Sequence, residues 1–153
     1  IYHLLMTKSA KKTAYSIMTD GEVLAVSLSE FRKPEINVKC GENPKIGINL
    51  FLDCETVYLP DKVSEKLGLD GLEKFVSEDL KKKLKSYLSK TSTFLKTDTE
   101  NFSRYAKRNF LTQKAWNEYG WEEKYKNAEF DVNVEVNVAK FGVLKDNIND
   151  SKK

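Results

Sequence analysis

Histidine and cysteine, which often serve in nucleophilic catalysis and metal binding, are scarce in this sequence. It contains one histidine, His3, and two cysteines among 153 residues. A Ser-His-Asp or Cys-His pair would have to be built at the chain end, and a histidine metal cluster is impossible. Two cysteines alone cannot form a structural zinc site. The composition therefore argues against these enzymes and metal centres.

Other signs of chemistry are also few. The seven glycines form neither a phosphate-binding loop nor a dinucleotide fingerprint. Paired carboxylates such as Asp53 with Glu55 occur by chance in a chain with 23 acidic residues, and a glycosidase needs a defined separation in a cleft. We expect a protein that is not an enzyme, has no cofactor and binds no metal. A carboxylate-based hydrolase is the alternative.

Long apolar runs are missing as well. The longest stretches, such as Leu50-Phe51-Leu52, are far below the roughly 20 residues of a membrane-spanning helix. With 40% apolar and 32% charged residues, the chain suits one soluble globular domain, which we expect over residues 1–145 with a disordered polar tail at 146–153. Because residue 1 is not methionine, we expect a fragment of a longer protein.

The net charge of +3 is small, and we expect it to be spread along the chain. One local run, Lys81-Lys82-Lys83 with Lys85, follows Glu78 and Asp79. This run predicts the solvated face of a helix, with a phosphate-binding patch as the alternative. The aromatic and basic residues of 105–110 allow nucleic-acid binding, but an amphipathic helix explains them more simply, so we expect no nucleic-acid partner.

The first sixty residues read as strands. Asp20-Gly21 lies between the extended segments 13–18 and 23–28 and predicts a hairpin turn. A second extended stretch carries Ile36 and Val38, and residues 46–52 alternate with period 2. Cys54 ends that strand and is expected to be a buried free thiol. A disulfide with Cys40 across neighbouring strands is the alternative.

The following segments are predominantly helical. Asp61 is a plausible N-cap of a short helix ending near Gly68, and Asp70 a second cap of a helix reaching Lys90. Thr91-Ser-Thr93 is a possible joint. The stripe of the longer helix recurs every four residues at Leu72, Val76, Leu80, Leu84 and Leu88.

Short helices are expected at 102–109, 112–119 and 121–125, the last two on either side of Gly120. Residues 130–138 alternate valine with polar residues without error after Phe130, which predicts a half-buried strand. The order of elements predicts an α+β fold. It consists of a mainly antiparallel sheet with a long amphipathic helix and shorter helices packed on it.

Aromatic residues are concentrated between positions 105 and 130, including both tryptophans. At least one tryptophan is expected to belong to the core. Others are candidates for exposed anchors, because tryptophan and tyrosine dominate interface hot spots. With an aspartate in the preceding turn, the candidate partner-binding residues are Asp98, Phe102, Tyr105, Phe110, Trp116 and Trp121.

The same region resembles the C-terminal region of the Ger(x)C family, the C subunits of bacterial spore germinant receptors. Trp116, Trp121, the valine strand and Gly142 match the family pattern by position, and the lysine-rich helix 72–90 also fits. The resemblance is good over residues 70–142 and loose over 13–60. One departure is that Asp98 is followed by Thr-Glu-Asn-Phe-Ser, where the family commonly has glycines.

The resemblance implies a lipoprotein anchored through an N-terminal cysteine outside this fragment, on the outer face of the spore inner membrane. It implies that the protein acts with integral membrane A and B subunits in nutrient-triggered germination. We therefore expect a non-enzymatic scaffold or interaction domain of that receptor. A domain that binds the small-molecule germinant itself is the alternative.

Overall fold

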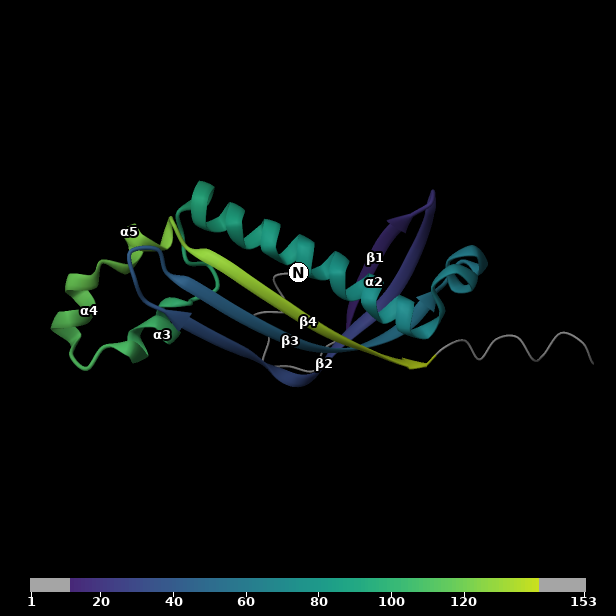
Figure 1. The fold of residues 1–153 in the computed structure, drawn as a ribbon, viewed down its shortest axis with the longest axis horizontal. Helices are drawn as coiled ribbons and strands as arrows, with labels where there is room; N and C mark the ends of the chain where they lie inside the picture. Colours follow the sequence, from purple (N-terminus) through teal and green to yellow (C-terminus); the bar gives the residue numbers. More distant parts are fainter. Residues whose placement is uncertain (1–11, 141–153) are drawn as a thin grey trace, which may run out of the picture.

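The structure, a computed structural model, describes residues 12–140, and Figure 1 shows them as a long twisted sheet with helices on one face and at one end. The sheet has four strands in the order β1-β2-β3-β4. The strands are β1 (Thr13–Thr19), β2 (Glu22–Lys39), β3 (Lys45–Tyr58) and β4 (Glu129–Lys140). This α+β architecture confirms the predicted fold class. The predicted tail at 146–153 lies outside the described residues.

The predicted hairpin is confirmed. Asp20 and Gly21 form a two-residue loop between β1 and β2, and both have positive φ angles of 50° and 80°. Positive φ at both loop residues is the geometry of a type I′ turn, whose twist matches that of the flanking strands. The stretch around Ile36 is not a separate strand, because β2 runs continuously through it. Register shifts next to Arg32 let the strand bend and accommodate Pro34.

Both directions of strand pairing occur in the sheet. β1 pairs with β2 and β2 with β3 in antiparallel orientation, whereas β3 pairs with β4 in parallel. A parallel pair needs a long crossover, which residues 59–128 with all the helices supply. The predicted strand at 130–138 is confirmed, and the sheet is mainly antiparallel as expected.

The long helix α2 (Asp61–Lys90) packs on one face of the sheet and lies chiefly against β4. Its predicted stripe is confirmed, since all five residues have no exposed surface. They meet the inward residues of β3 and β4, namely Ile46, Ile48, Leu50, Leu52, Val132, Val134 and Val136. Burial of each such side chain contributes about 1.5–3 kcal/mol, which fixes α2 on the sheet.

The predicted helix caps differ from the structure. Pro60 occupies the N-cap position, so Asp61 is the first helical residue and not the cap. Gly68 has non-helical backbone angles, with φ 62° and ψ −171°, so the segment labelled α2 consists of two helical stretches joined by a kink at this glycine. The predicted break near Gly68 is therefore confirmed, and Asp70 lies at the start of the second stretch. A positive φ is accessible to glycine because it has no Cβ.

Side chains of α2 cover part of the free edge of β4. The Ser77 hydroxyl donates to the carbonyl of Val134, and Glu73 accepts a hydrogen bond of 2.9 Å from the backbone N–H of Val138. Edge strands otherwise present unpaired backbone groups to other chains. These contacts bind α2 to the strand by polar as well as apolar groups.

Both cysteines are free, Cys54 buried and Cys40 half-buried. The expected buried thiol at Cys54 is confirmed, but this residue does not end its strand, which continues to Tyr58. Cys40 follows Lys39, which pairs with Lys45, whereas Cys54 lies nine residues farther along β3. At about 3.3 Å per residue the separation is roughly 30 Å, far beyond the reach of a disulfide.

None of the helices within residues 12–140 combines the length and the apolar character that crossing a membrane requires.

Candidate functional site

The candidate site is built from the segment that connects α2 to β4, at the end of the sheet where β2 ends and β3 and β4 begin (Figure 1). A π-helix, η1 (Thr91–Leu95), follows α2 directly and confirms the predicted joint. The short helices are α3 (Ser103–Ala106), η2 (Lys107–Asn109), α4 (Gln113–Tyr119) and α5 (Trp121–Tyr125). They confirm the predicted helices, including the pair on either side of Gly120.

Asp98 organises the first part of this segment. One carboxylate oxygen accepts the backbone N–H of Phe102 at 2.7 Å. The other accepts the backbone N–H of Ser103 at 2.7 Å and the indole N–H of Trp121 at 3.1 Å. The carboxylate therefore caps α3 and fixes Trp121 at the same time. Its acceptor positions are used inside the domain, so Asp98 holds the site together.

The turn after Asp98 forms without glycine. Asn101 takes the left-handed conformation with a φ of 56°, and Lys96 does so before the turn with a φ of 52°. Asparagine is several-fold enriched in this region of backbone space among residues with a side chain. The resembled family commonly has glycines at this turn, and here Asn101 takes the left-handed conformation in their place.

A continuous series of aromatic contacts leads from the core to the surface. Phe102 and Tyr125 are fully buried with ring centroids 6.4 Å apart, and Trp121 stands 5.4 Å from Tyr125. Trp116 stacks on Trp121 with ring centroids 6.1 Å apart, and Phe110 meets Trp116 edge-on at 5.5 Å. Only the outer two, Trp116 and Phe110, are half-exposed.

This burial separates the predicted site residues into two groups. Phe102, with no exposed surface, and Trp121, with 6%, belong to the core, which confirms the expectation that one tryptophan is internal. Phe110 and Trp116 present part of their rings to solvent. Tyr105 is also half-buried, and the guanidinium groups of Arg104 and Arg108 lie 5.6 and 5.1 Å from its ring centroid. Such cation–ring contacts hold the arginines in place.

The outer helices are tied to the turn between β2 and β3. The Tyr119 hydroxyl donates to the carbonyl of Gly41 at 2.9 Å and accepts the N–H of Gly41 at 3.1 Å. Lys124 pairs with Glu42 at 2.8 Å, and the Asn109 amide donates to the carbonyl of Val38. Burial raises the pKa of Tyr119, so its hydroxyl remains a donor at neutral pH. No pattern in the sequence indicates this role of Tyr119.

A buried carboxylate is bound to the C-terminal part of α2. Glu100 is 4% exposed, and one of its oxygens accepts from the Tyr87 hydroxyl at 2.8 Å and from Thr99 at 3.1 Å. Burial, and secondarily the nearby Asp98, raises the pKa of Tyr125 well above its usual range. Sequence analysis missed Glu100 because one acid among 23 carries no pattern that predicts burial.

A shallow hollow of about 750 Å³ lies beside the aromatic residues. It brings together three of the six predicted site residues, Asp98, Trp116 and Trp121. Lys96 lines it together with Glu122 and Glu123, so opposite charges lie around the two tryptophans. Phe102, Tyr105 and Phe110 do not line it.

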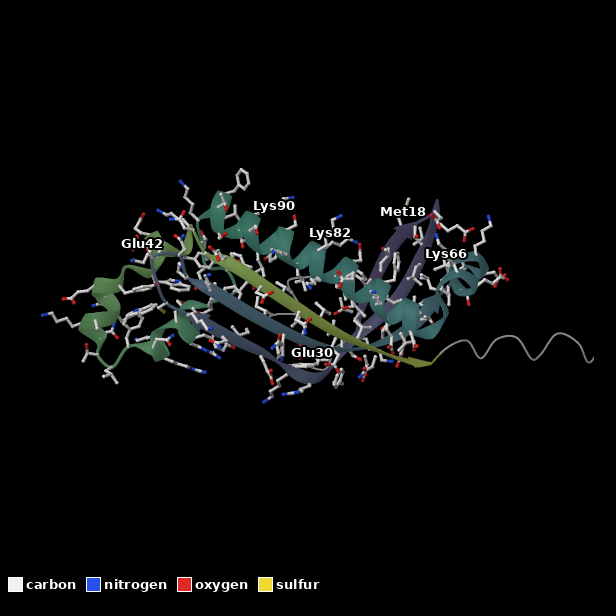
Figure 2. All side chains as sticks on the ribbon, in the orientation of Figure 1. Met18, Glu30, Glu42, Lys66, Lys82 and Lys90 are labelled. Atoms are coloured by element: carbon white, nitrogen blue, oxygen red, sulfur yellow. The ribbon has the colours of Figure 1, made fainter. Side chains whose placement is uncertain are left out.

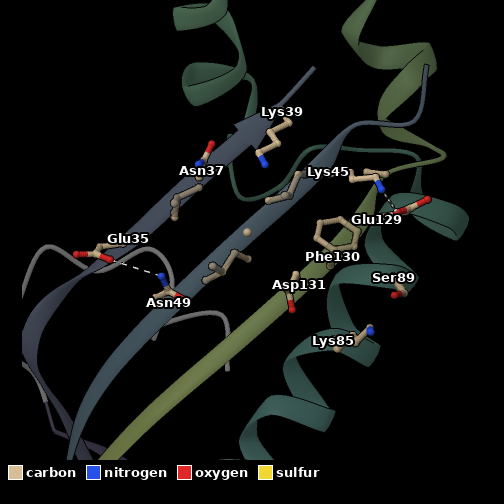
Figure 3. A pocket seen from close by; sticks show the side chains of 15 residues that line it. Glu35, Asn37, Lys39, Lys45, Asn49, Lys85, Ser89, Glu129, Phe130 and Asp131 are labelled. Atoms are coloured by element: carbon tan, nitrogen blue, oxygen red, sulfur yellow. Dashed lines mark hydrogen bonds and ion pairs between the residues drawn. The ribbon is translucent and has the colours of Figure 1, made fainter. Parts of the chain in front are cut away.

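A second hollow, of about 950 Å³, lies on the sheet beside β4 and is drawn in Figure 3. Two pairs form among its polar side chains: Lys45 lies 3.5 Å from Glu129, and the Asn49 amide nitrogen 3.5 Å from the Glu35 carboxylate. None of the predicted site residues lines it. Within residues 12–140, no three potential ligands are grouped as a metal ion would require.

Comparisons with known proteins agree with this architecture. Residues 1–142 match the family described as spore germination B3/GerAC like, C-terminal. The chain is similar in structure to the solved GerBC protein, with a TM-score of 0.63 at 16% sequence identity. That match covers 85% of this chain and 41% of GerBC, so the chain spans less than half the length of its structural relative.

No curated protein matches the sequence. The family match extends over nearly all the described elements, and the chain belongs to the C-terminal domain family of spore germination B3/GerAC-like proteins.

Proposed function

We propose that this chain is a non-enzymatic interaction domain of a spore germinant receptor and that it binds its partners through the aromatic end of the sheet. Membership of a spore germination family implies a role in germination. The single observation that carries the proposal is the half-exposed pair Phe110 and Trp116, in which Trp116 stacks on the buried Trp121. The partners would be the integral membrane A and B subunits.

The aromatic end has the features of an interface hot spot. Such spots consist of a few aromatic anchors held in place by neighbouring residues before binding. Here Trp116 rests on Trp121, which Asp98 fixes, and α4 is tied to the β2–β3 turn through Tyr119. Leu111, between Phe110 and α4, is fully exposed and adds an apolar contact beside them. Because these side chains are already held in place, they would lose little conformational entropy on binding, and this favours affinity.

A function in binding also fits the side chains available. Polar groups of the aromatic end, such as the Asp98 carboxylate and the Trp121 indole N–H, are engaged in holding it together. In the complete protein, we propose, a lipid anchor on a preceding segment holds the domain at the outer face of the spore inner membrane.

Substitution of the outer aromatic residues tests the proposal. In the full-length protein, Trp116→Ala and Leu111→Asp should reduce co-purification of the A and B subunits and slow germination, while the protein accumulates normally. Val57→Asp is the matched control, since Val57 is 70% exposed in β3, more than ten residues along the strand from the Gly41 turn. Normal subunit recovery and germination with both aromatic-end variants would reject the interface.

The hollow beside the tryptophans supports a second candidate function, which is binding of the germinant. Its lining offers an ammonium group at Lys96 and carboxylates at Glu122 and Glu123 around two aromatic rings. A zwitterionic nutrient such as an amino acid requires charges of both signs. Titration of the chain with nutrient germinants, followed by tryptophan fluorescence, separates the two functions. A saturable response that is lost in Lys96→Gln would favour the ligand site over the scaffold.

A further inference from the structure

The outer face of α2 and the turn that follows it carry a concentration of positive charge. Residues 74–96 contain seven lysines and two carboxylates, a net charge of +5, whereas the whole chain carries +3. The rest of the chain therefore sums to −2. The expectation of an even spread of charge is wrong, and the run at 81–85 is part of a longer basic surface.

The periodicity of α2 decides which lysines face solvent. The stripe from Leu72 to Leu88 faces the sheet, which places Lys74 and Lys82 on the far side of the helix, whereas Lys85 lines the hollow beside β4 (Figure 3). Lys74 and Lys82 are exposed, and Figure 2 shows Lys82 and Lys90 directed away from the sheet along the outside of α2. The basic surface is therefore a face of the domain that the sheet does not cover.

Two other charged groups on α2 neutralise each other. Lys83 lies 2.9 Å from Asp79 and 4.8 Å from the ring centroid of Tyr15, toward β1. The remaining carboxylate, Glu78, lies among the lysines. We define the lysine face as the lysines on the outer side of α2 and in the turn after it, together with the two apolar residues between them. Its residues are Lys74, Lys81, Lys82, Lys90, Phe94, Leu95 and Lys96.

The apolar end of the lysine face is made by the π-helix. Phe94 is 79% exposed and Leu95 62%, with Lys90 before them and Lys96 after them. Thr91 and Ser92 are buried and hold the base of the turn through hydrogen bonds to the carbonyls of α2. Insertions of this type in helices are frequent at functional sites. The turn thus presents two large apolar side chains to solvent beside a row of cations.

We propose that the lysine face docks on the surface of an anionic lipid bilayer. The ammonium groups would bind lipid phosphates, and Phe94 and Leu95 would enter the interface between headgroups and acyl chains. Segments that lie on membranes combine these two features, lysines for anionic headgroups and bulky apolar side chains for the interface. The aromatic end of the sheet would then remain free for protein partners.

The arrangement favours a bilayer over other anions. Single-stranded nucleic acid is bound by several aromatic rings interleaved with cations along a groove. The lysine face instead has one ring, and its apolar side chains stand together at one end. Lysines spread along a straight helix of about 24 Å between positions 74 and 90 suit an extended flat surface.

Vesicle binding by the 153-residue chain tests the proposal. We expect it to sediment with vesicles of phosphatidylcholine containing 30% phosphatidylserine, to leave pure phosphatidylcholine unbound, and to bind less at high salt. Lys74→Gln with Lys82→Gln should weaken binding at least ten-fold, at about five-fold for each lysine near the surface. Lys39→Gln with Lys107→Gln removes the same charge from exposed positions elsewhere and should change affinity less than two-fold.

A second pair of variants tests the apolar part. Phe94→Ser should weaken binding several-fold without changing its salt dependence, whereas Leu111→Ser at the aromatic end should not. Circular dichroism confirms that each variant is folded. Absence of binding to the anionic vesicles, or equal effects of the two lysine pairs, would overturn the proposal. So would equally tight binding of a DNA oligonucleotide that is insensitive to Phe94→Ser, because the lysine face would then be a general polyanion site.

Discussion

Trp121 and Asp98 are 23 residues apart in the sequence, and the indole N–H of Trp121 donates to the Asp98 carboxylate over 3.1 Å. The same carboxylate accepts the first two backbone N–H groups around α3. One side chain therefore joins the turn after the π-helix to the last helix before β4.

Replacing Asp98 should loosen the aromatic end. Asp98→Ala removes acceptors for three donors, two of them in backbone, and we expect a loss of about 2–4 kcal/mol in the free energy of unfolding. The emission of Trp121 should also shift, because its indole loses a partner. Urea denaturation followed by fluorescence measures both. Asp131→Ala, at an exposed position of β4, is the matched control. A change below 0.5 kcal/mol for Asp98→Ala would contradict the role assigned to it.

Shortening a side chain in the buried stripe of α2 should lower the free energy of unfolding strongly. Leu84 has no exposed surface, so Leu84→Ala should cost about 2–5 kcal/mol through lost burial and the cavity left behind. Leu95 is 62% exposed, and Leu95→Ala should stay within about 0.5 kcal/mol. Thermal and urea unfolding of the two variants give the comparison. Similar losses for both would mean that α2 does not pack as described.

The edge of β4 offers a test of a polar contact. Ser77→Ala removes the hydroxyl that donates to the carbonyl of Val134, and about 1 kcal/mol of stability should be lost. Because the uncovered carbonyl can accept from another chain, the variant should also self-associate more readily in sedimentation experiments. Ser86→Ala, on the exposed side of the same helix, controls for the loss of a serine. Identical behaviour of the two variants would show that the contact is dispensable.

Much of this fold follows from the pattern of the sequence. The alternation at 130–138, the four-residue stripe of α2 and the Asp20-Gly21 turn each satisfy one strong local rule. Alternation shows which face of a strand is buried but says nothing of its neighbour, so the parallel pairing of β4 with β3 could not be derived. The continuity of β2 through Pro34 was hidden because proline normally interrupts a strand, and here a bulge accommodates it.

The candidate site was predictable only in part. Trp116 and Trp121 were found from the concentration of aromatic residues, but their difference in exposure arises from tertiary packing. Glu100 and Tyr119 were missed because their partners, Tyr87 and Gly41, belong to other elements. The exposure of Phe94 and Leu95 depends on the π-helix, whose residues satisfy no local pattern that distinguishes it from an α-helix.

The two thiols should differ sharply in reactivity. Cys40 is half-buried, and Cys54 has no exposed surface. Ellman's reagent at pH 8 should therefore modify one thiol in the folded chain and two in urea. Cys40→Ser should leave no reactive thiol in the folded state. Rapid reaction of both thiols without denaturant would mean that β3 is not the packed central strand described above.

Burial of Cys54 also predicts a dependence of stability on pH. Burial, with smaller contributions from Glu73 and Glu55, raises the pKa of the Cys54 thiol to about 11. The unfolded chain would release this proton near the ordinary value of about 8.5. A raised pKa means that the contribution of the neutral thiol is fully present below 8.5 and is lost as pH rises through about 11. Lysines and tyrosines titrate in the same range, so the effect of Cys54 must be isolated by comparing two variants.

The measurement is the difference in the free energy of unfolding between Cys40→Ser and the double variant Cys40→Ser with Cys54→Ala. This stability gap should be constant from pH 6 to 8 and should move in favour of the double variant between pH 9 and 11. A gap that does not change across that range would show that the Cys54 proton is released equally in the folded and unfolded chains.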